Sequence, residues 1–407
     1  MGLTAADDDP APLVPWRTRP MCRRPASYPG AMNETSAPDQ HEPAADASAP
    51  VERIRTRACL EALPAYVAGK PPADDGRRRY KVSSNESPYA PIPAVLDAAT
   101  AALTAANRYP DMGVRALREA LAARHDVTPE QICVSTGSTA VIADLVRAVV
   151  DPGDEVVYPW RSFEAYPIIV GAQGGTSIRV PLTASHVHDL PAMAAAITER
   201  TRLVLLCTPN NPTGTSLSYE ALASFLRKVP QDVVVAIDEA YREFHEPATV
   251  ADTTALFRDH ANVILLRTFS KLQGLAGLRI GYGIAHPRLA RALTAVTIPF
   301  GASAPAQAAA LASLQPDVCE ELDRRAAALR AERDRVQDAL AADGWDLPRS
   351  QGNFVFFPVG ERTGQFAAFC DEHGLVVRPY GTDGVRVTIA EPEANDLLLE
   401  ICRQRRS

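Results

Sequence analysis

Short apolar runs alternate with helix-like segments along most of this chain from about Val95 onwards, and this pattern constrains the fold most strongly. Several runs are apolar throughout and lack inside–outside alternation, as expected of strands covered on both faces. The runs are 132–134, 155–158, 177–180, 202–207, 233–237, 263–266 and 278–284. Helical segments such as 139–150, 218–229 and 287–296 separate most of them. The alternation predicts an α/β domain with a mainly parallel central sheet sandwiched by helices.

The pattern changes after residue 305. A long helix rich in Arg, Ala and Glu is predicted over 318–342, and strands are predicted at 354–357, 375–378 and 385–389, before a final helix from about residue 393. This succession indicates a small α+β domain. We therefore predict a large α/β domain over 94–304, a smaller C-terminal domain over 305–407, and an N-terminal arm over 51–93 that joins the smaller domain.

Residues 1–50 differ from the rest of the chain. They are rich in Pro, Ala, Asp and Ser and show no sustained hydrophobic period, so we expect a disordered extension outside the fold. The net charge of −7 gives no electrostatic case for binding nucleic acid or an anionic membrane. Seven scattered cysteines without a C-x-x-C pair argue against a metal site and indicate a reducing compartment, so we expect a cytoplasmic protein.

Lys271 is one of only four lysines among the 42 Lys and Arg residues of the chain. It follows an apolar run, within the segment TFSKLQGLAGLR. A lysine amine can condense with an aldehyde, whereas an arginine stays protonated and cannot. Ser270 and Arg279 flank it with a hydroxyl and a cation that could hold a phosphate. A solvated loop lysine explains this segment equally well when the segment is taken alone.

Polar residues also stand where other predicted strands end. Asp238 closes the strand in VVVAIDEAYREF, and Tyr241 follows three residues later. A carboxylate buried there needs a cation to offset its desolvation, and a protonated pyridine nitrogen would be such a cation. Alternatively, Asp238 caps the next helix.

Three further segments carry weaker signals. In LLCTPNNPTGT, the Asn211 amide could donate to the phenolic oxygen of a bound ring, or the segment is a plain tight turn. In VSTGSTAV, the Gly-Ser-Thr at a strand-to-helix junction either binds phosphate or caps the helix. The segment PWRSFEAY supplies aromatic side chains for ring stacking or for the core.

Taken in order, these segments resemble a known family. NES, RYPD, GST, WRSFEAYP, PNNPTGT, IDEAY, TFSK…GLAGLRIGY and VRPYGTDGVRVTIA are similar to motifs of the fold-type I, class II aminotransferases that use pyridoxal 5′-phosphate (PLP), within the histidinol-phosphate aminotransferase subfamily. WRSFEAYP and VVRPYGTDGVRVT most resemble the actinobacterial aromatic amino acid (phenylalanine) aminotransferases. The resemblance extends from roughly residue 57 to the C-terminus, and the ordered set is highly specific.

The resemblance implies a role for each matching residue. Lys271 would bind the cofactor covalently and then move a proton, while Asp238 would keep the pyridine nitrogen protonated. Asn211 and Tyr241 would hydrogen-bond the 3′-oxygen of the ring, and Phe163 would stack on it. The cofactor phosphate would be held by Gly137, Ser138, Thr139, Ser270 and Arg279, and by Tyr109 from a second subunit. The substrate would be bound by Arg386 at its carboxylate and by Arg378, Asn353 and Tyr66.

The resemblance also implies a reaction and an assembly. We expect a homodimer with shared active sites that transaminates phenylalanine or tyrosine with a 2-oxo acid such as 2-oxoglutarate. Histidinol phosphate is the alternative donor, because two arginines fit either role. Leu272-Gln273 replaces the small-then-aromatic pair that usually follows the lysine, and Ala90 stands where a glycine is common. Both departures concern the expected substrate pocket.

Two other classes of protein fit the sequence less well. A non-catalytic PLP-binding regulator usually carries an N-terminal helix-turn-helix, and residues 1–50 show no helical periodicity. A dinucleotide-dependent oxidoreductase would need a G-x-G-x-x-G after a strand, and no such motif follows a predicted strand here.

Overall fold

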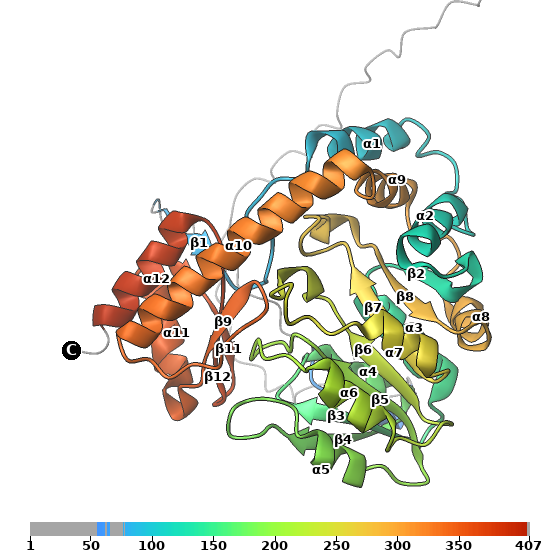
Figure 1. Ribbon diagram of the computed structural model, residues 1–407, viewed down its shortest axis with the longest axis horizontal. Helices are drawn as coiled ribbons and strands as arrows, with labels where there is room; N and C mark the ends of the chain where they lie inside the picture. Colours follow the sequence, from blue (N-terminus) through green and yellow to red (C-terminus); the bar gives the residue numbers. More distant parts are fainter. Residues whose placement is uncertain (1–54, 62, 66–75, 77, 405–407) are drawn as a thin grey trace, which may run out of the picture. The chain divides into compact units, whose positions relative to one another are not determined.

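The computed structural model describes residues 55–61, 63–65, 76 and 78–404, and every element below belongs to the unit Thr56–Ser407 (Figure 1). A seven-stranded sheet forms the centre of its larger part, in the order β2-β8-β7-β6-β5-β3-β4. The strands are β2 (Ile132–Ser135), β3 (Glu155–Trp160), β4 (Thr176–Pro181), β5 (Thr201–Cys207), β6 (Val234–Asp238), β7 (Val263–Thr268) and β8 (Gly281–Ala285).

The strands from β7 to β4 in this sheet pair in parallel, and β8 is antiparallel to both of its neighbours, β2 and β7. The predicted α/β class with a mainly parallel sheet is therefore confirmed. The predicted strand 278–284 begins later than expected, at Gly281. The cause is local, because Ala276–Leu278 form a 3₁₀ turn and Arg279 adopts a left-handed conformation with φ 55°.

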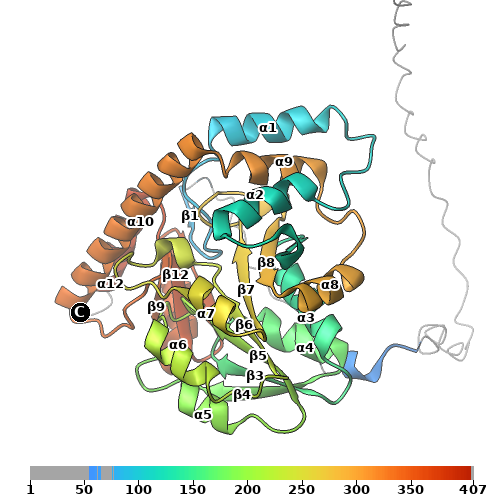
Figure 2. The ribbon, with the colours of Figure 1, turned by 45° about the vertical axis from the view of Figure 1, so that its right-hand side comes forward.

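Both faces of the sheet are buried, which explains the uninterrupted apolar runs. Successive residues of a strand point to opposite faces, so Val235 and Ile237 of β6 join one apolar cluster and Ala236 joins the other. The helices on the Ala236 side are α3 (Ser138–Val149), α4 (Ala165–Gln173) and α8 (Pro287–Val296). The helices on the other side include α2 (Arg115–His125), α5 (Leu190–Ala195), α6 (Tyr219–Leu226) and α7 (Thr253–Asp259) (Figure 2).

The C-terminal part contains a second, smaller sheet. Its antiparallel strands lie in the order β11 (Arg378–Tyr380), β12 (Gly384–Thr388) and β9 (Phe354–Phe357). The short strand β1 (Tyr80–Lys81) pairs in parallel with β10 (Leu375–Val376). The remaining α-helices are α1 (Pro93–Leu103), α9 (Ala304–Ala312), α10 (Pro316–Ala342), α11 (Thr363–Glu372) and α12 (Pro392–Gln404). The β1–β10 pairing brings the residues before α1 next to the C-terminal part, which matters for the site below.

No helix among the described residues is long and apolar enough to cross a membrane. The same residues contain no group of three or more His, Cys, Asp or Glu side chains placed to hold a metal ion. The predicted extension 1–50 lies outside the described residues, as do residues 51–54, 62, 66–75 and 77 of the predicted arm 51–93. The predicted domain boundaries therefore stay predictions.

Arg333 ties the long helix α10 to the larger part of the unit. Its side chain is 1% exposed, and its Nη1 donates to the backbone carbonyl of Phe244 at 2.6 Å. Its Nε donates to the carboxylate of Asp334 at 3.0 Å. Phe244 ends the 3₁₀ turn η4 (Arg242–Phe244), which begins just after Tyr241. One buried guanidinium thus holds α10 against the loop that follows β6.

We expect Arg333→Met to lower the free energy of unfolding by about 2–4 kcal/mol, because a buried carbonyl loses its donor. Urea denaturation measures the change. Arg335→Met is the matched control on the same helix, where the arginine forms exposed ion pairs with Glu332 and Asp396. Its effect should stay within about 1 kcal/mol. Equal losses in the two variants would contradict the role assigned to Arg333.

Candidate active site

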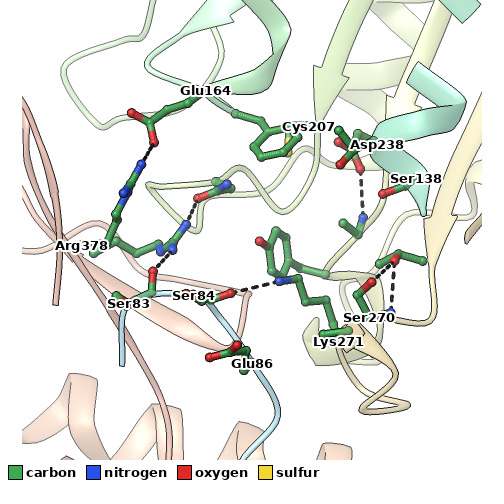
Figure 3. A pocket seen from close by; sticks show the side chains of 18 of the residues that line it. Ser83, Ser84, Glu86, Ser138, Glu164, Cys207, Asp238, Ser270, Lys271 and Arg378 are labelled. Carbon is green, nitrogen blue, oxygen red and sulfur yellow. Dashed lines mark hydrogen bonds and ion pairs between the residues drawn. The ribbon is translucent and has the colours of Figure 1, made fainter. Parts of the chain in front are cut away.

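A cavity of about 290 Å³ lies where the carboxyl ends of β5, β6 and β7 meet the N-terminus of α3, the residues before α1, and the small sheet. Ligands of α/β sheets bind at this edge. In Figure 3, Asp238, Ser138 and Ser270 lie on one side of the cavity, Ser83 and Arg378 lie on the other, and Lys271 lies between the two groups. The lining residues are Ser83, Ser84, Glu86, Ser138, Thr139, Phe163, Glu164, Cys207, Asn211, Asp238, Ala240, Tyr241, Thr268, Ser270, Lys271, Ala276, Arg279, Arg378, Tyr380 and Arg386.

Asp238 is the last residue of β6 and its side chain is buried. Its carboxylate accepts hydrogen bonds from the Tyr166 hydroxyl at 2.9 Å and from the Ala240 backbone N–H at 3.2 Å. Burial raises the pKa of Asp238 to about 6, although these two hydrogen bonds act in the opposite direction. A cation bound beside this carboxylate would therefore be stabilised strongly, because water does not screen it there.

Lys271 lies three residues beyond the end of β7, and its amine points into the cavity (Figure 3). Nζ donates to the backbone carbonyls of Ser84 at 3.2 Å and Asn85 at 3.1 Å, and it lies 5.4 Å from the centre of the Tyr241 ring. Burial lowers the pKa of Lys271 to about 7, and the guanidinium of Arg386 acts in the same direction. A substantial share of the amine is therefore unprotonated near neutral pH, which is the form that attacks an aldehyde.

Tyr241 is held by Asn85, which belongs to the NES motif but received no role in the sequence analysis. The Asn85 amide donates to the Tyr241 hydroxyl at 3.0 Å, and Asn85 itself is fully buried with its φ at 52°. Burial raises the pKa of Tyr241 well above its usual value, so the hydroxyl stays protonated. It therefore remains a hydrogen-bond donor for an anionic oxygen in the cavity.

A cationic corner suited to an anion forms at the N-terminus of α3. Ser138 and Thr139 begin this helix and line the cavity, and the first N–H groups of a helix have no partner within it. Gly137 precedes them with φ 95°, and a Cβ at that position would come within 2.8 Å of Arg279 Nη2. Only glycine therefore allows the guanidinium to approach this closely. Ser270 lines the same corner, and its hydroxyl is hydrogen-bonded to Thr268 at 2.9 Å.

Arg386 on β12 occupies the opposite side of the cavity and is buried. Nη1 donates to Asn211 Oδ1 at 2.5 Å and to the Tyr380 hydroxyl at 2.7 Å, and Nη2 donates to the Ser83 carbonyl at 2.6 Å. Its Nε, by contrast, is buried and has no hydrogen-bond partner among the described residues. An unpaired buried donor on a cation is costly unless an acceptor completes it, so this side is suited to a carboxylate.

Arg378 on β11 stands directly opposite Arg386 in the ladder of the small sheet, so both side chains leave the same face. Unlike Arg386, it forms an ion pair with the cavity residue Glu164, with 2.6 Å between Nη2 and Oε2. The charge of Arg378 is thus balanced by the protein itself.

The other predicted site residues lie in different places. Phe163 lines the cavity, 5.5 Å from the centre of the Tyr166 ring. Asn353 is buried near the site and donates to the Asn85 carbonyl at 3.4 Å, but it does not line the cavity. Tyr109 is 82% exposed and packs on Phe300, away from the cavity of its own chain. Tyr66 lies outside the described residues.

Several cavity residues were missed by the sequence analysis. Ser83, Ser84, Glu164 and Tyr380 line the cavity, and Tyr166 donates a hydrogen bond to the carboxylate of Asp238. Glu164 and Tyr166 belong to the motif WRSFEAYP quoted above, and Tyr380 belongs to VRPYGTDG. Their roles depend on contacts across 72 to 303 positions of sequence, which no local pattern reveals.

The fold is that of an aminotransferase. The family model for class I and II aminotransferases matches residues 79–401, and the chain belongs to this family. Among its curated relatives is an aromatic amino acid aminotransferase of Streptomyces coelicolor, 51% identical over 86% of this chain and 98% of that protein. An aromatic amino acid aminotransferase of Rhodococcus jostii is 51% identical over 85% of this chain and 94% of that protein.

Solved structures agree with this assignment. The histidinol-phosphate aminotransferase of Sinorhizobium meliloti in complex with pyridoxal 5′-phosphate aligns with a TM-score of 0.77 and 29% identity, over 86% of this chain and 98% of that one. An aspartate aminotransferase of Thermus thermophilus with maleate aligns with a TM-score of 0.72 and 26% identity, over 81% of this chain and 92% of that one.

Class I and II aminotransferases depend on PLP, and the residues of the cavity fit this cofactor. A buried carboxylate, Asp238, suits a protonated ring nitrogen, and the depressed pKa of Lys271 suits attack on an aldehyde. The close approach of Arg279 to Gly137 leaves a cationic corner at a helix N-terminus for the phosphate.

We expect Asp238→Asn to stabilise the cofactor-free protein, and to do so mainly above pH 6. Since the folded pKa of about 6 lies above that of an unfolded aspartate, the folded state holds this proton more tightly. In the wild-type protein, the free energy of unfolding therefore falls as pH rises from about 4 through 6, because Asp238 ionises in a buried place. An asparagine does not ionise, so the variant avoids this loss. Urea denaturation at pH 5 and pH 8 should show a gain of about 1–2 kcal/mol at pH 8 and a smaller one at pH 5.

Asp126→Asn is the control for this experiment, because the Asp126 side chain is 92% exposed and pairs only with Arg258 among the described residues. It should leave the pH dependence unchanged. A loss of stability at pH 8 in Asp238→Asn would show that burial does not disfavour this carboxylate.

Proposed function

We propose that this protein catalyses PLP-dependent transamination of an aromatic L-amino acid, phenylalanine or tyrosine, with a 2-oxo acid such as 2-oxoglutarate. The observation that carries the proposal is the convergence of a buried carboxylate and an amine of depressed pKa in one cavity beside a helix N-terminus. When bound, the cofactor supplies an aldehyde that condenses with amines and a ring that accepts electrons from the substrate Cα.

Within this proposal, Asp238 holds the ring nitrogen in its protonated form. At about 4 Å and an effective dielectric constant near 20, such a pair is worth roughly 4 kcal/mol before desolvation. Tyr166 and the Ala240 N–H fix the carboxylate in one orientation. Tyr241, Asn211 and Phe163 line the same cavity; the first two would hydrogen-bond the ring oxygen, and Phe163 would cover the ring face.

Lys271 serves first as the covalent anchor of the cofactor and then as the base that moves the substrate proton. Both tasks need a neutral amine, and burial provides it near pH 7. The carbonyls of Ser84 and Asn85 accept hydrogen bonds from the amine, so they orient it within the cavity. A base whose pKa lies near the working pH transfers protons efficiently in both directions.

The phosphate is held, in this proposal, by the α3 N-terminus together with Ser270 and Arg279. A second copy of the chain adds Tyr109, which is exposed in the single chain and stacks at 4.6 Å on Phe300. Met112 and Ile298 nearby in sequence are also exposed apolar residues. Such a group is unusual on a free surface, and it supports a homodimer in which each subunit contributes to the site of the other.

Arg386 binds the carboxylate of the amino acid and of the oxo acid. Its unpaired Nε has room for one more acceptor, and charge-assisted bonds of this kind are strong. The aromatic donor is supported by two observations. The relatives that share half of their residues with this chain are named for aromatic amino acids. Arg378, which a phosphorylated donor would need, is already paired with Glu164.

We expect Lys271→Ala to abolish both covalent cofactor attachment and turnover. Borohydride reduction of the protein loaded with PLP, followed by peptide mass mapping, should find the added cofactor mass on Lys271. Lys228→Ala, which changes an exposed lysine two residues after the end of α6, is the matched control and should keep the visible absorption band and the activity. Cofactor mass on a different lysine would refute the assignment.

We expect phenylalanine and tyrosine to give a much higher kcat/KM than histidinol phosphate when all three are assayed with 2-oxoglutarate. Arg386→Gln should lower kcat/KM for the aromatic donors about 10- to 100-fold while PLP stays bound, because one charged hydrogen-bonding partner is lost. A preference for histidinol phosphate would overturn the aromatic assignment but keep the aminotransferase.

A further inference from the structure

A second cavity, of about 430 Å³, lies on the other side of the segment that carries Lys271. Thr268 lines both cavities. Lys271 lines only the first of these two, whereas the next residues, Leu272 and Gln273, line only the second. The departure from the usual aminotransferase sequence at Leu272-Gln273 therefore concerns this second cavity and not the proposed substrate pocket.

Cationic side chains dominate the second cavity. Four arginines line it: Arg124, Arg242, Arg267 and Arg330. Arg242 and Arg267 share one buried carboxylate, that of Glu239, at 2.8 and 2.9 Å. Arg124 and Arg330 form no ion pair with any described residue. Instead, Arg124 donates to the Cys319 sulfur at 3.3 Å, and Arg330 donates to the Glu243 backbone carbonyl at 3.0 Å.

Acidic groups do not balance these cations fully. The carboxylates that line the cavity belong to Glu243 and Asp323. With the carboxylate of Glu239, three carboxylates thus face the four guanidinium groups. The cavity therefore keeps a positive potential, and a small anion would be attracted into it.

Two buried polar atoms of the cavity have no hydrogen-bond partner among the described residues. One is Nη2 of Arg267, whose residue is only 7% exposed, and the other is Oε1 of Gln273. The Arg267 Nη1 is already used, because it lies 3.2 Å from Nδ1 of His125. Burial together with Arg267 lowers the pKa of His125 to about 3, so this ring is neutral and competes for no anion. The site thus lacks one acceptor for a guanidinium and one donor for an amide.

Apolar side chains form part of the wall, beside polar residues that include His245, Tyr282 and Ser313. Phe269, Leu272 and Leu322 line the cavity and are all buried. A volume of about 430 Å³ exceeds what an inorganic anion needs, and small-molecule sites typically join apolar walls to a few placed polar groups. Guanidinium groups match the geometry of a carboxylate in two-pronged contacts.

We propose that this second cavity binds a small organic carboxylate with an apolar body and a hydrogen-bond donor beside the carboxylate. The carboxylate completes Arg267 and meets Arg330, the donor completes Gln273, and the apolar body packs on Phe269 and Leu272. Because Leu272 adjoins Lys271, the occupant would contact the chain segment that carries the amine of the first cavity.

The probe for the test is mandelate, which has a carboxylate, an adjacent hydroxyl and a phenyl ring. Calorimetric titration uses full-length protein loaded with PLP and carrying Arg386→Gln, so that binding at the first cavity is weakened. We expect one mandelate per chain with a Kd of about 1 mM or tighter. Absence of binding up to about 10 mM would overturn the proposal.

Added to this background, Arg330→Gln should weaken mandelate at least about tenfold, since a charge-assisted contact is lost. Arg324→Gln is the matched control, because Arg324 lies on the same helix and pairs outside the cavity with Glu321. Equal binding by the two variants would refute the site. If Arg330→Gln does not fold, Arg330→Lys replaces it, because a lysine keeps the positive charge but cannot make the two-pronged contact with a carboxylate.

Gln273→Leu tests the donor. It should weaken mandelate several-fold and leave phenylacetate, which has no hydroxyl, unchanged. The same loss for both probes would contradict a hydrogen bond to Gln273. These comparisons do not depend on the proposed function, because the paired arginine variants differ only at the second cavity whether or not Arg386 binds substrate.

Discussion

Desolvation of two opposite charges in one cavity is the constraint on which the rest of the site depends. Asp238 and Lys271 both lose water when the chain folds, and both pKa values move toward the neutral forms. Neither residue finds an ion-pair partner within 4 Å among the described residues, so each is held only by neutral hydrogen bonds. The protein keeps two groups that are unfavourable alone, and a ligand with a cationic ring and an aldehyde would complete both.

The central sheet holds the buried Asp238 in its unfavourable environment. Asp238 ends a strand that is covered on both faces by apolar clusters, so the backbone that carries it cannot relax toward water. Stability stored in the apolar core thus offsets the unfavourable environment of a few polar residues at its edge. The small sheet closes the cavity from the other side, where Asn211 and Ser83 fix the guanidinium of Arg386 in place.

Much of this could be predicted from sequence because the signals are local. The apolar runs gave the strands to within a few residues, and the positions of Asp238 and Lys271 just after such runs indicated the edge where they would meet. The start of β8 was predicted too early because apolar residues continue through the turn where Arg279 takes its left-handed conformation. The contacts of Asn85, Tyr166 and Glu164 join distant segments, and the second cavity is lined by five separate segments of the chain. Such long-range contacts and such a cavity leave no pattern in the local sequence.

The reversal of β8 has a consequence for how this family can vary. Because β8 runs back against β7, the connection between them starts and finishes at the same edge of the sheet, and Lys271 and Arg279 both lie on it. One loop thereby carries both residues to which the proposed function assigns the cofactor, Lys271 for its aldehyde and Arg279 for its phosphate. Adding or deleting a residue between Lys271 and Arg279 would change the distance between the two side chains. We therefore expect the length of this loop to be kept when its sequence changes.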